Sequence, residues 1–274
     1  MRLLHVSDLH FGRSSVPAQV EALEAFIARE SLDAIVISGD LSQRTRRSEF
    51  ERAAVFVRRC ESRAPTVVVP GNHDCAWWTG MLGAGGFYSM FNRYREYIRS
   101  DIEPQVRVEG ATIVGLNSAH GIQTYTLTTR PRDLTVVGAV LRGQWARART
   151  AFAMAPPGDL RVLVVHHNVL RGKLSNRWGL ASREFGLVDI AHSGADLVCC
   201  GHDHEERIEG VSAGRRHIVV STAGTMTDRT RGGRPGSWNL IDADAKQVSV
   251  ALYEWQPAGA FMRSRTSTFA RRTS

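Results

Sequence analysis

Polar side chains that can bind metal ions follow five short apolar runs of this sequence. These apolar runs end near residues 6, 38, 69, 165 and 200. The polar residues that follow them are Asp8, His10, Asp40, Asn72, His73, Asp74, His166, His167, His202 and His204. Because the carboxyl ends of parallel strands lie at one edge of a sheet, we expect these side chains to meet there. Carboxylate oxygens together with imidazole nitrogens suit Mn, Fe or Zn, whereas an all-oxygen set would suit Mg or Ca.

These residues are numerous enough to bind two ions. The seven candidate metal ligands are Asp8, His10, Asp40, Asn72, His166, His202 and His204. They can serve two divalent metal ions if Asp40 bridges them, and spacing alone does not choose between His166 and His167. Two ions about 4 Å apart can stabilise both the attacking and the leaving oxygen of a phosphoryl transfer. The sequence therefore predicts a dinuclear centre whose ions are Mn, Fe, Zn or similar.

The elements that must position these residues are read from the hydrophobic pattern. In the first third, apolar runs at 3–6, 34–38 and 66–69 alternate with helical spacing over 16–27 and 48–60. This βαβαβ order predicts parallel strands with helices packed on the sheet.

The α/β pattern continues beyond residue 70 and then changes. Helices are expected near 87–99, 144–154 and 185–192, and strands at 112–116, 162–165 and 197–200. Runs at 217–221, 238–241 and 248–253 alternate apolar and polar residues, which is typical of antiparallel strands. The stretch 210–214 matches the GxSxG elbow of serine hydrolases, but we expect it to be a hairpin turn because no helix follows it.

In this order, the motifs DLH, GD, GNHD, H and GHDH resemble those of the calcineurin-like metallophosphoesterase superfamily. The resemblance implies an α/β fold, a four-layer αββα sandwich of two mixed β-sheets with a dinuclear metal site at the strand ends. It also implies that Asp40 bridges the two ions. The remaining ligands would be divided into Asp8, His10 and His204 for one ion and Asn72, His166 and His202 for the other.

The same resemblance implies catalytic roles. His73 would be the general acid near the leaving group and Asp74 would orient it, in agreement with the common pairing of a proton-donating imidazole with a carboxylate. The family pattern favours His166 over His167 as the ligand, which leaves His167 beside the metal centre. His167, Asn117 and Trp77 are the candidates for substrate contacts.

Further stretches resemble bacterial class III cyclic-AMP phosphodiesterases: SDLHFGR, LNSA at 116–119 and AGTMTDRTRGGRPGSWNLI at 223–241. They imply hydrolysis of a cyclic nucleotide-like phosphodiester by a hydroxide that bridges the metal ions. Asp203, the pair Trp77-Trp78 and Asn168 depart from the usual pattern and leave the substrate open. The alternatives are a nuclease of the DNA-repair type, a nucleotide-sugar-lipid pyrophosphatase, a phosphomonoesterase and a non-catalytic scaffold.

Composition and charge limit the class of protein. The 274 residues are 43% hydrophobic, and no stretch is long and apolar enough for a membrane helix or a secretory signal, so a cytoplasmic enzyme is expected. The net charge of +8 favours an anionic, nucleotide-like phosphate ester, with nucleic acid as a less favoured partner. We expect one metallophosphoesterase domain over 1–255 and a basic C-terminal tail over 256–274. Fraying is the default expectation for this tail, with a last edge strand or an anion-binding flap as the alternatives.

Overall fold

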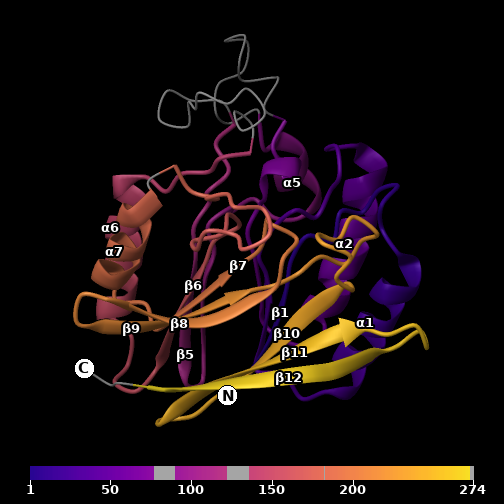
Figure 1. The fold of residues 1–274 in the computed structure, drawn as a ribbon. Coiled ribbons are helices and arrows are strands. Elements are labelled where there is room, and N and C mark those ends of the chain that lie inside the picture. The colour runs from indigo at the N-terminus through magenta and orange to yellow at the C-terminus, as the bar shows by residue number, and fades with distance from the viewer. Residues whose placement is uncertain (77–89, 122–135, 182, 272–274) are drawn as a thin grey trace.

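Two six-stranded β-sheets pack face to face, and helices cover their outer faces (Figure 1). The computed structural model describes residues 1–76, 90–121, 136–181 and 183–271. The predicted four-layer αββα sandwich with two mixed sheets is therefore confirmed.

The first sheet has the strand order β12-β11-β10-β1-β2-β3. Its strands are β1 (Arg2–Val6), β2 (Ala34–Ile37), β3 (Thr66–Val68), β10 (Ser237–Ala243), β11 (Gln247–Trp255) and β12 (Phe261–Ala270). β1, β2 and β3 are parallel, as the βαβαβ pattern predicts, and β10, β11 and β12 continue the sheet as antiparallel strands.

The second sheet has the order β4-β5-β6-β7-β9-β8. Its strands are β4 (Gln105–Val108), β5 (Ala111–Gly115), β6 (Leu160–Val164), β7 (Leu197–Cys200), β8 (Arg207–Ala213) and β9 (Arg216–Thr222). β5, β6, β7 and β9 are parallel, while β4 and β8 are antiparallel edge strands.

Helices lie on the two outer faces. α1 (Pro17–Arg29), α2 (Arg47–Glu61) and α5 (Asn92–Tyr97) pack on the first sheet, and α6 (Arg142–Ala153) and α7 (Arg183–Ser193) pack on the second (Figure 1). Within the described residues, no helix is long and apolar enough to cross a membrane.

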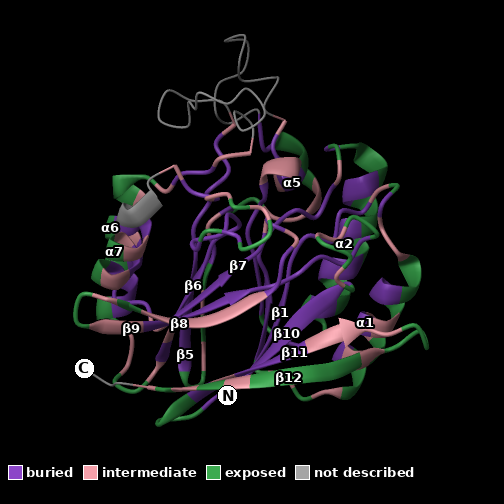
Figure 2. Ribbon diagram, in the orientation of Figure 1, coloured by how far each residue is buried: buried purple, intermediate pink, exposed green. Residues whose placement is uncertain are grey.

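Successive side chains along a strand point to opposite faces of its sheet, and this alternation produces three apolar layers. Leu4 of β1 packs toward α1 and α2, whereas its neighbour Leu3 packs between the two sheets. A third cluster joins the second sheet to α6 and α7, and all of these strand residues are buried (Figure 2). Strands buried on both faces read as continuous apolar runs, which is why the central strands were predictable.

The C-terminal segment differs from its expected conformation. Residues 261–270 do not fray but form β12, which pairs with β11 along its whole length. The boundary expected at residue 255 therefore does not separate a tail from the sheet. The alternating Arg, Ser and Thr side chains of β12 are mostly exposed, which is typical of a charged edge strand.

One other local prediction is confirmed only in part. Residues 210–213 of the GxSxG stretch lie in β8, and only its last residue, Gly214, whose φ is +60°, lies in the hairpin turn. The serine-hydrolase elbow is still excluded, because β8 leads through this turn directly into β9. β4 was not predicted, since its four residues are half-exposed at a sheet edge.

Candidate metal centre

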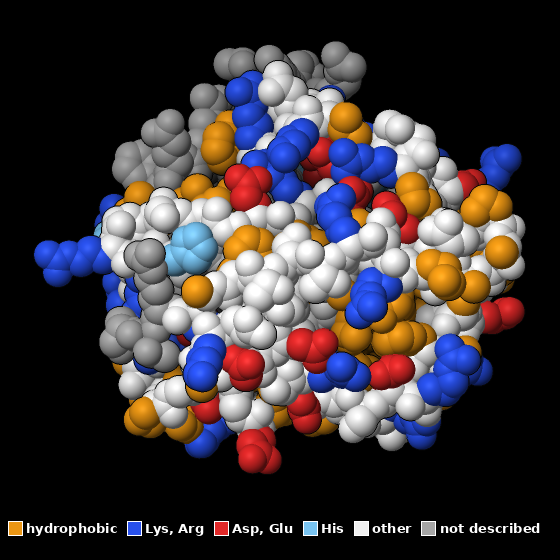
Figure 3. All heavy atoms as spheres, turned by 60° about the horizontal axis from the view of Figure 1, so that its bottom comes forward, with side chains coloured by type: hydrophobic (Ala, Val, Ile, Leu, Met, Phe, Trp, Pro, Cys, Tyr) orange, Lys and Arg blue, Asp and Glu red, His pale blue; other side chains and the backbone are white. Residues whose placement is uncertain are grey.

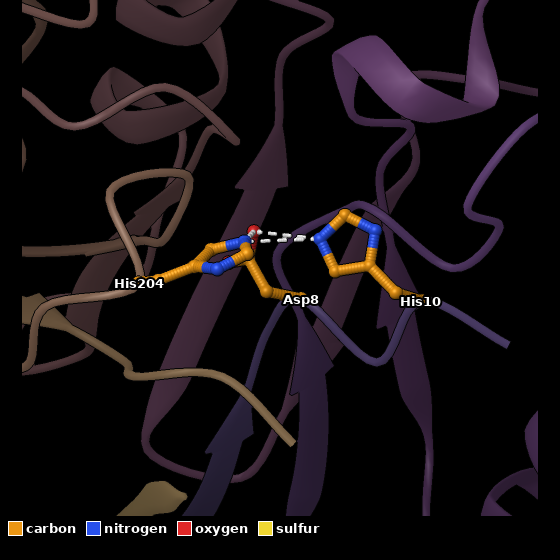
Figure 4. Close-up of side chains that lie close together, drawn as sticks. All are labelled: Asp8, His10 and His204. Atoms are coloured by element: carbon orange, nitrogen blue, oxygen red, sulfur yellow. Dashed lines mark hydrogen bonds and ion pairs between the residues drawn. The ribbon is translucent and has the colours of Figure 1, made fainter. Parts of the chain in front are cut away.

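The seven predicted ligands lie in the loops that follow β1, β2, β3, β6 and β7. Asp8 and His10 follow β1, Asp40 follows β2, and His204 follows β7. Figure 4 shows the rings of His10 and His204 reaching toward each other from opposite sides, with the Asp8 carboxylate between them. The expectation that strand ends gather these side chains is met by this arrangement.

The first group of donors is compact and almost fully buried. His204 Nε2 is 3.2 Å from Asp8 Oδ1, and His10 Nε2 is 3.6 Å from the same oxygen. The two Nε2 atoms of His10 and His204 are 3.0 Å apart. These three residues form one set of donor atoms in which each lies close enough to share a single cation.

A second group lies beside the first, with Asp40 between them. Asn72 Oδ1 is 3.1 Å from His166 Nε2 and 2.9 Å from His202 Nδ1. Asp40 Oδ2 is 3.3 Å from His166 Nε2 and 3.6 Å from His10 Nε2. Asp40 thus touches a donor of each group, which is the position that a bridging carboxylate would occupy.

In three of these histidines, a backbone carbonyl determines which ring nitrogen carries the proton of the neutral imidazole. Nδ1 of His10 faces the Ser42 carbonyl at 3.2 Å, and Nδ1 of His166 faces the Ser38 carbonyl at 2.8 Å. Nδ1 of His204 faces the carbonyl of residue 229 at 2.7 Å. A carbonyl can only accept, so each neutral ring carries its proton on Nδ1 and a lone pair on Nε2. Partners of this kind orient metal-binding histidines.

The donor chemistry therefore fits two divalent cations. Neutral His10 and His204 would direct two lone pairs at each other across 3.0 Å, an arrangement that a shared cation stabilises. Nitrogen and oxygen donors in this mixture suit borderline ions such as Mn, Fe or Zn.

Strained backbone is concentrated at the same residues. Among the described part of the chain, seven non-glycine residues have clearly positive φ. Five of these are predicted ligands: Asp8, His10, Asp40, His202 and His204. Such conformations cost about 1–3 kcal/mol each and persist where the surrounding structure enforces them, commonly at functional sites.

Glycine is required where two ligand loops meet, and this leads to a prediction for Gly71. A Cβ there would lie 2.0 Å from Asp40 Oδ1 and 2.4 Å from the Asp40 amide nitrogen. We expect Gly71→Ala to lower the free energy of unfolding by about 1–3 kcal/mol, because the Asp40 backbone must move. Gly143→Ala is the matched control, since a Cβ at that helical glycine meets nothing within 4 Å. Urea denaturation checks both, and equal midpoints for the two variants would contradict the prediction.

The electrostatics of the centre favour cations. Burial alone would raise the pKa of Asp40, but the charges of His166 and His73 outweigh it and hold this pKa well below its usual range. Burial opposes charge on His166 too, yet the Asp40 carboxylate raises the pKa of His166 to about 9. By contrast, burial and the nearby His166 lower the pKa of His202 to about 3.

Metal loading should therefore release protons. At about pH 7, His166 binds a proton that a metal ion must displace, since its pKa is about 9. We expect about one proton or more to be released per protein, and the apparent affinity to rise roughly tenfold per pH unit per displaced proton until pH reaches that pKa. Calorimetric titration with Mn²⁺ in buffers of different ionisation enthalpy measures the release. A binding heat that is independent of the buffer would contradict it.

His73 and Asp74 occupy the site differently from the expected pairing. The Asp74 carboxylate is fully buried and accepts N–H groups of Leu41, Ser42 and Gly71 at 2.7–3.1 Å. The His73 ring instead places Nδ1 2.8 Å from the Gln43 carbonyl. The prediction that Asp74 directly orients His73 is therefore wrong: Asp74 holds the backbone of the Asp40 loop.

Two of the three candidate substrate contacts, His167 and Asn117, lie within the described residues. His167 is buried, with Nδ1 2.8 Å from Ser118 Oγ and its ring 4.5 Å from that of His202, so it supports a metal-site residue. Asn117 is also buried, and its Oδ1 accepts the N–H of Ala119. A contact with substrate stays a prediction for both residues. Trp77 lies outside the described residues.

Several supporting groups were not predicted. Glu49, at the start of α2, is buried and its Oε2 accepts N–H groups of Gln43, Arg44 and Arg46 at 2.8–3.2 Å. It thereby fixes the loop whose Gln43 carbonyl contacts His73. A glutamate early in a helix reads as an ordinary capping residue, so the sequence contains no signal for this role.

A two-sheet sandwich with this donor cluster at its strand ends defines a metallophosphoesterase architecture. The chain belongs to the calcineurin-like phosphoesterase family, whose sequence model matches residues 1–206. This family membership supports a metal-dependent hydrolase of phosphoric esters. Among proteins with curated descriptions, none matches this sequence.

Solved structures share the fold at low identity. Purple acid phosphatase PPD1 from yellow lupin (Lupinus luteus) seeds superposes with a TM-score of 0.71 and 12% identity, covering 99% of this chain and 54% of that one. PhoD superposes with a TM-score of 0.66 and 12% identity, covering 98% of this chain and 69% of that one. GAP50, the anchor in the inner membrane complex of Plasmodium, superposes with a TM-score of 0.58 and 12% identity, covering 99% of this chain and 89% of that one. The chain thus spans about half the length of the lupin phosphatase.

Proposed function

We propose that this protein is a metal-dependent phosphodiesterase acting on a nucleotide-like phosphodiester. The observation that carries the proposal is the convergence of six side chains with N and O donors around Asp40. GAP50, an anchor in the inner membrane complex of Plasmodium, shares the fold, and a fold alone does not imply hydrolysis. The donor cluster is complete, which favours an enzyme over a scaffold.

We assign the first ion to Asp8, His10 and His204, the second to Asn72, His166 and His202, and the bridge to Asp40. Mn and Fe are the proposed ions. When bound, two such ions would activate water and neutralise charge on the phosphate. The protein supplies fixed donors whose geometry is enforced by buried carbonyls and strained loops, so little reorganisation accompanies the reaction.

His73 is the proposed general acid. Its Nδ1 faces the Gln43 carbonyl at 2.8 Å, and its backbone N–H donates to Asp40 Oδ1 at 2.9 Å. A ring nitrogen of His73 lies within 4.8 Å of donor atoms of His10 and Asp40. Because Nδ1 faces a carbonyl and the residue is partly exposed, Nε2 is the nitrogen that would hand a proton to a departing oxygen. An alkoxide leaving group of a diester needs such a donor. The motif resemblance to cyclic-nucleotide phosphodiesterases supports the same substrate class.

The test compares two chromogenic esters on metal-stripped protein resupplied with manganese. Bis-p-nitrophenyl phosphate reports diester hydrolysis, and p-nitrophenyl phosphate reports monoester hydrolysis. We expect manganese-dependent turnover with a higher kcat/KM for the diester. A preference for the monoester would replace the proposal by a phosphatase, and two bound ions without turnover of either ester would favour the scaffold.

A further inference from the structure

Three arginines stand in the loops that frame the metal centre: Arg13, Arg44 and Arg229, which we call the arginine rim. Arg13 follows His10 by three residues. Arg44 follows Gln43, whose carbonyl contacts His73, and the Arg229 carbonyl accepts Nδ1–H of His204 at 2.7 Å. Arg44 and Arg229 thus lie in segments whose carbonyls contact a site histidine, and Arg13 lies in the loop that carries His10.

The loops of the rim are also fixed to one another. The N–H of Arg13 donates to Gln43 Oε1 at 2.8 Å, which joins the loop after β1 to the loop after β2. The N–H of Asp228 donates to the Ser14 carbonyl at 3.1 Å, which joins the first loop to the segment after β9. The three arginines therefore occupy fixed backbone positions on one continuous border of the centre.

Their charges are not used inside the fold. All three residues are exposed, and no hydrogen bond or ion pair joins their guanidinium groups to any residue in the described ranges. Glu49 lies near this loop, but it is buried and its Oε2 is occupied by backbone N–H groups. Asp228, the exposed neighbour of Arg229, contributes one negative charge against the three positive charges of the rim. The rim therefore remains positive.

Basic side chains outside the rim are arranged differently. On the face shown in Figure 3, basic and acidic side chains are interspersed. Many arginines elsewhere are paired with carboxylates, such as Arg47 with Glu51 at 2.9 Å on α2. A free guanidinium group on a fixed backbone suits bidentate binding of phosphate oxygens.

We propose that the arginine rim binds a second phosphate group of the substrate, beyond the one that is hydrolysed. This inference rests on the proposed function and narrows its substrate class to nucleotides that carry a further phosphate. The rim contributes binding energy outside the reacting centre, while the donor cluster and His73 act on the scissile ester.

Two substrates with the same scissile ester test the rim in the manganese-loaded enzyme. They are the p-nitrophenyl ester of thymidine 5′-phosphate and the same compound with a 3′-phosphate. We expect the 3′-phosphate to raise kcat/KM about tenfold or more at low salt, with the ratio falling as NaCl is added. Replacing all three rim arginines by alanine should bring the ratio to within about twofold of unity. Arg47→Ala, the matched control, should leave the ratio unchanged.

A binding measurement separates the rim from the chemistry. Calorimetry compares adenosine 3′,5′-bisphosphate with adenosine 5′-phosphate, and only the bisphosphate should lose affinity in the triple variant. If neither thymidine ester is hydrolysed but this difference persists, the proposed function fails and the rim stands. If the triple variant lowers kcat/KM equally for both thymidine esters, or binds both adenosine nucleotides as the unchanged protein does, the rim proposal is overturned. Oligothymidylates of increasing length show whether the second phosphate belongs to a nucleotide or to a longer strand.

Discussion

Asp40→Ala is expected to lower kcat/KM on a diester by at least about 10³-fold, the upper range for loss of one preorganised electrostatic group. The Asp40 carboxylate lies 3.3 Å from His166 Nε2 and 3.6 Å from His10 Nε2, so its removal separates the two donor groups. It also accepts the His73 N–H at 2.9 Å, so the proposed acid loses an anchor. No other side chain contacts both donor groups and His73 among the residues described.

Metal content distinguishes the loss of a bridging carboxylate from a general loss of structure in Asp40→Ala. Elemental analysis after manganese loading should find fewer ions in Asp40→Ala than in the unchanged protein. Asp40→Asn keeps an oxygen for the His73 N–H but removes the charge, so it should also lose metal. Asp244→Asn is the control, because that exposed carboxylate only accepts N–H groups of Lys246 and Gln247. Near-normal turnover and metal content in Asp40→Ala would refute the assignment of Asp40 as the bridge.

The ligand positions could be predicted because two simple rules apply to them together. Continuous apolar runs predict central strands that are buried on both faces. In a parallel sheet, the residues that follow each strand lie at the same edge of the sheet. Asp8 and His204 are 196 positions apart in sequence, yet their side-chain atoms lie 3.2 Å apart. These residues could be picked out as candidate metal donors in the sequence because carboxylates and imidazoles have specific chemistry.

The supporting groups could not be predicted in this way. His10, His73 and His166 are each oriented by a backbone carbonyl, and every residue has one. Which carbonyl contacts a given histidine depends on the conformation of the loops, and the residue types alone do not reveal that conformation. Asp74 shows the same limit: its neighbour in sequence is His73, but its carboxylate turns to the N–H groups of another loop.

The fate of residues 261–270 also depended on a partner distant from any local pattern. Arg, Ser and Thr residues alternate there with few apolar residues, which is typical of a frayed terminus as well as of an edge strand. The pairing with β11 resolves this, because it satisfies the backbone of both strands. The strand propensity of the residues alone is a weak guide to whether a segment forms the edge strand of a sheet.

His73→Ala is expected to have an effect that depends on the leaving group. For a diester whose leaving group is an ordinary alcohol, kcat should fall by about 10²–10⁴-fold, the usual contribution of general acid catalysis. For a p-nitrophenyl diester the loss should be under about tenfold, because this phenolate departs without a proton. A ring nitrogen of His73 lies within 4.8 Å of donor atoms of His10 and Asp40, so the ring stands beside the proposed reaction centre.

A further readout, the metal content, separates proton donation from metal binding. The metal content of His73→Ala should equal that of the unchanged protein, since the proposed ligand sets do not include this residue. His192→Ala serves as the control, because that histidine is exposed on α7, on the far face of the second sheet. Equal losses on both diesters would instead place His73 in contact with the phosphate or an ion. A loss confined to the alcohol leaving group, with both ions retained, requires that His73 supplies the proton, because no change in phosphate binding could discriminate between leaving groups in that way.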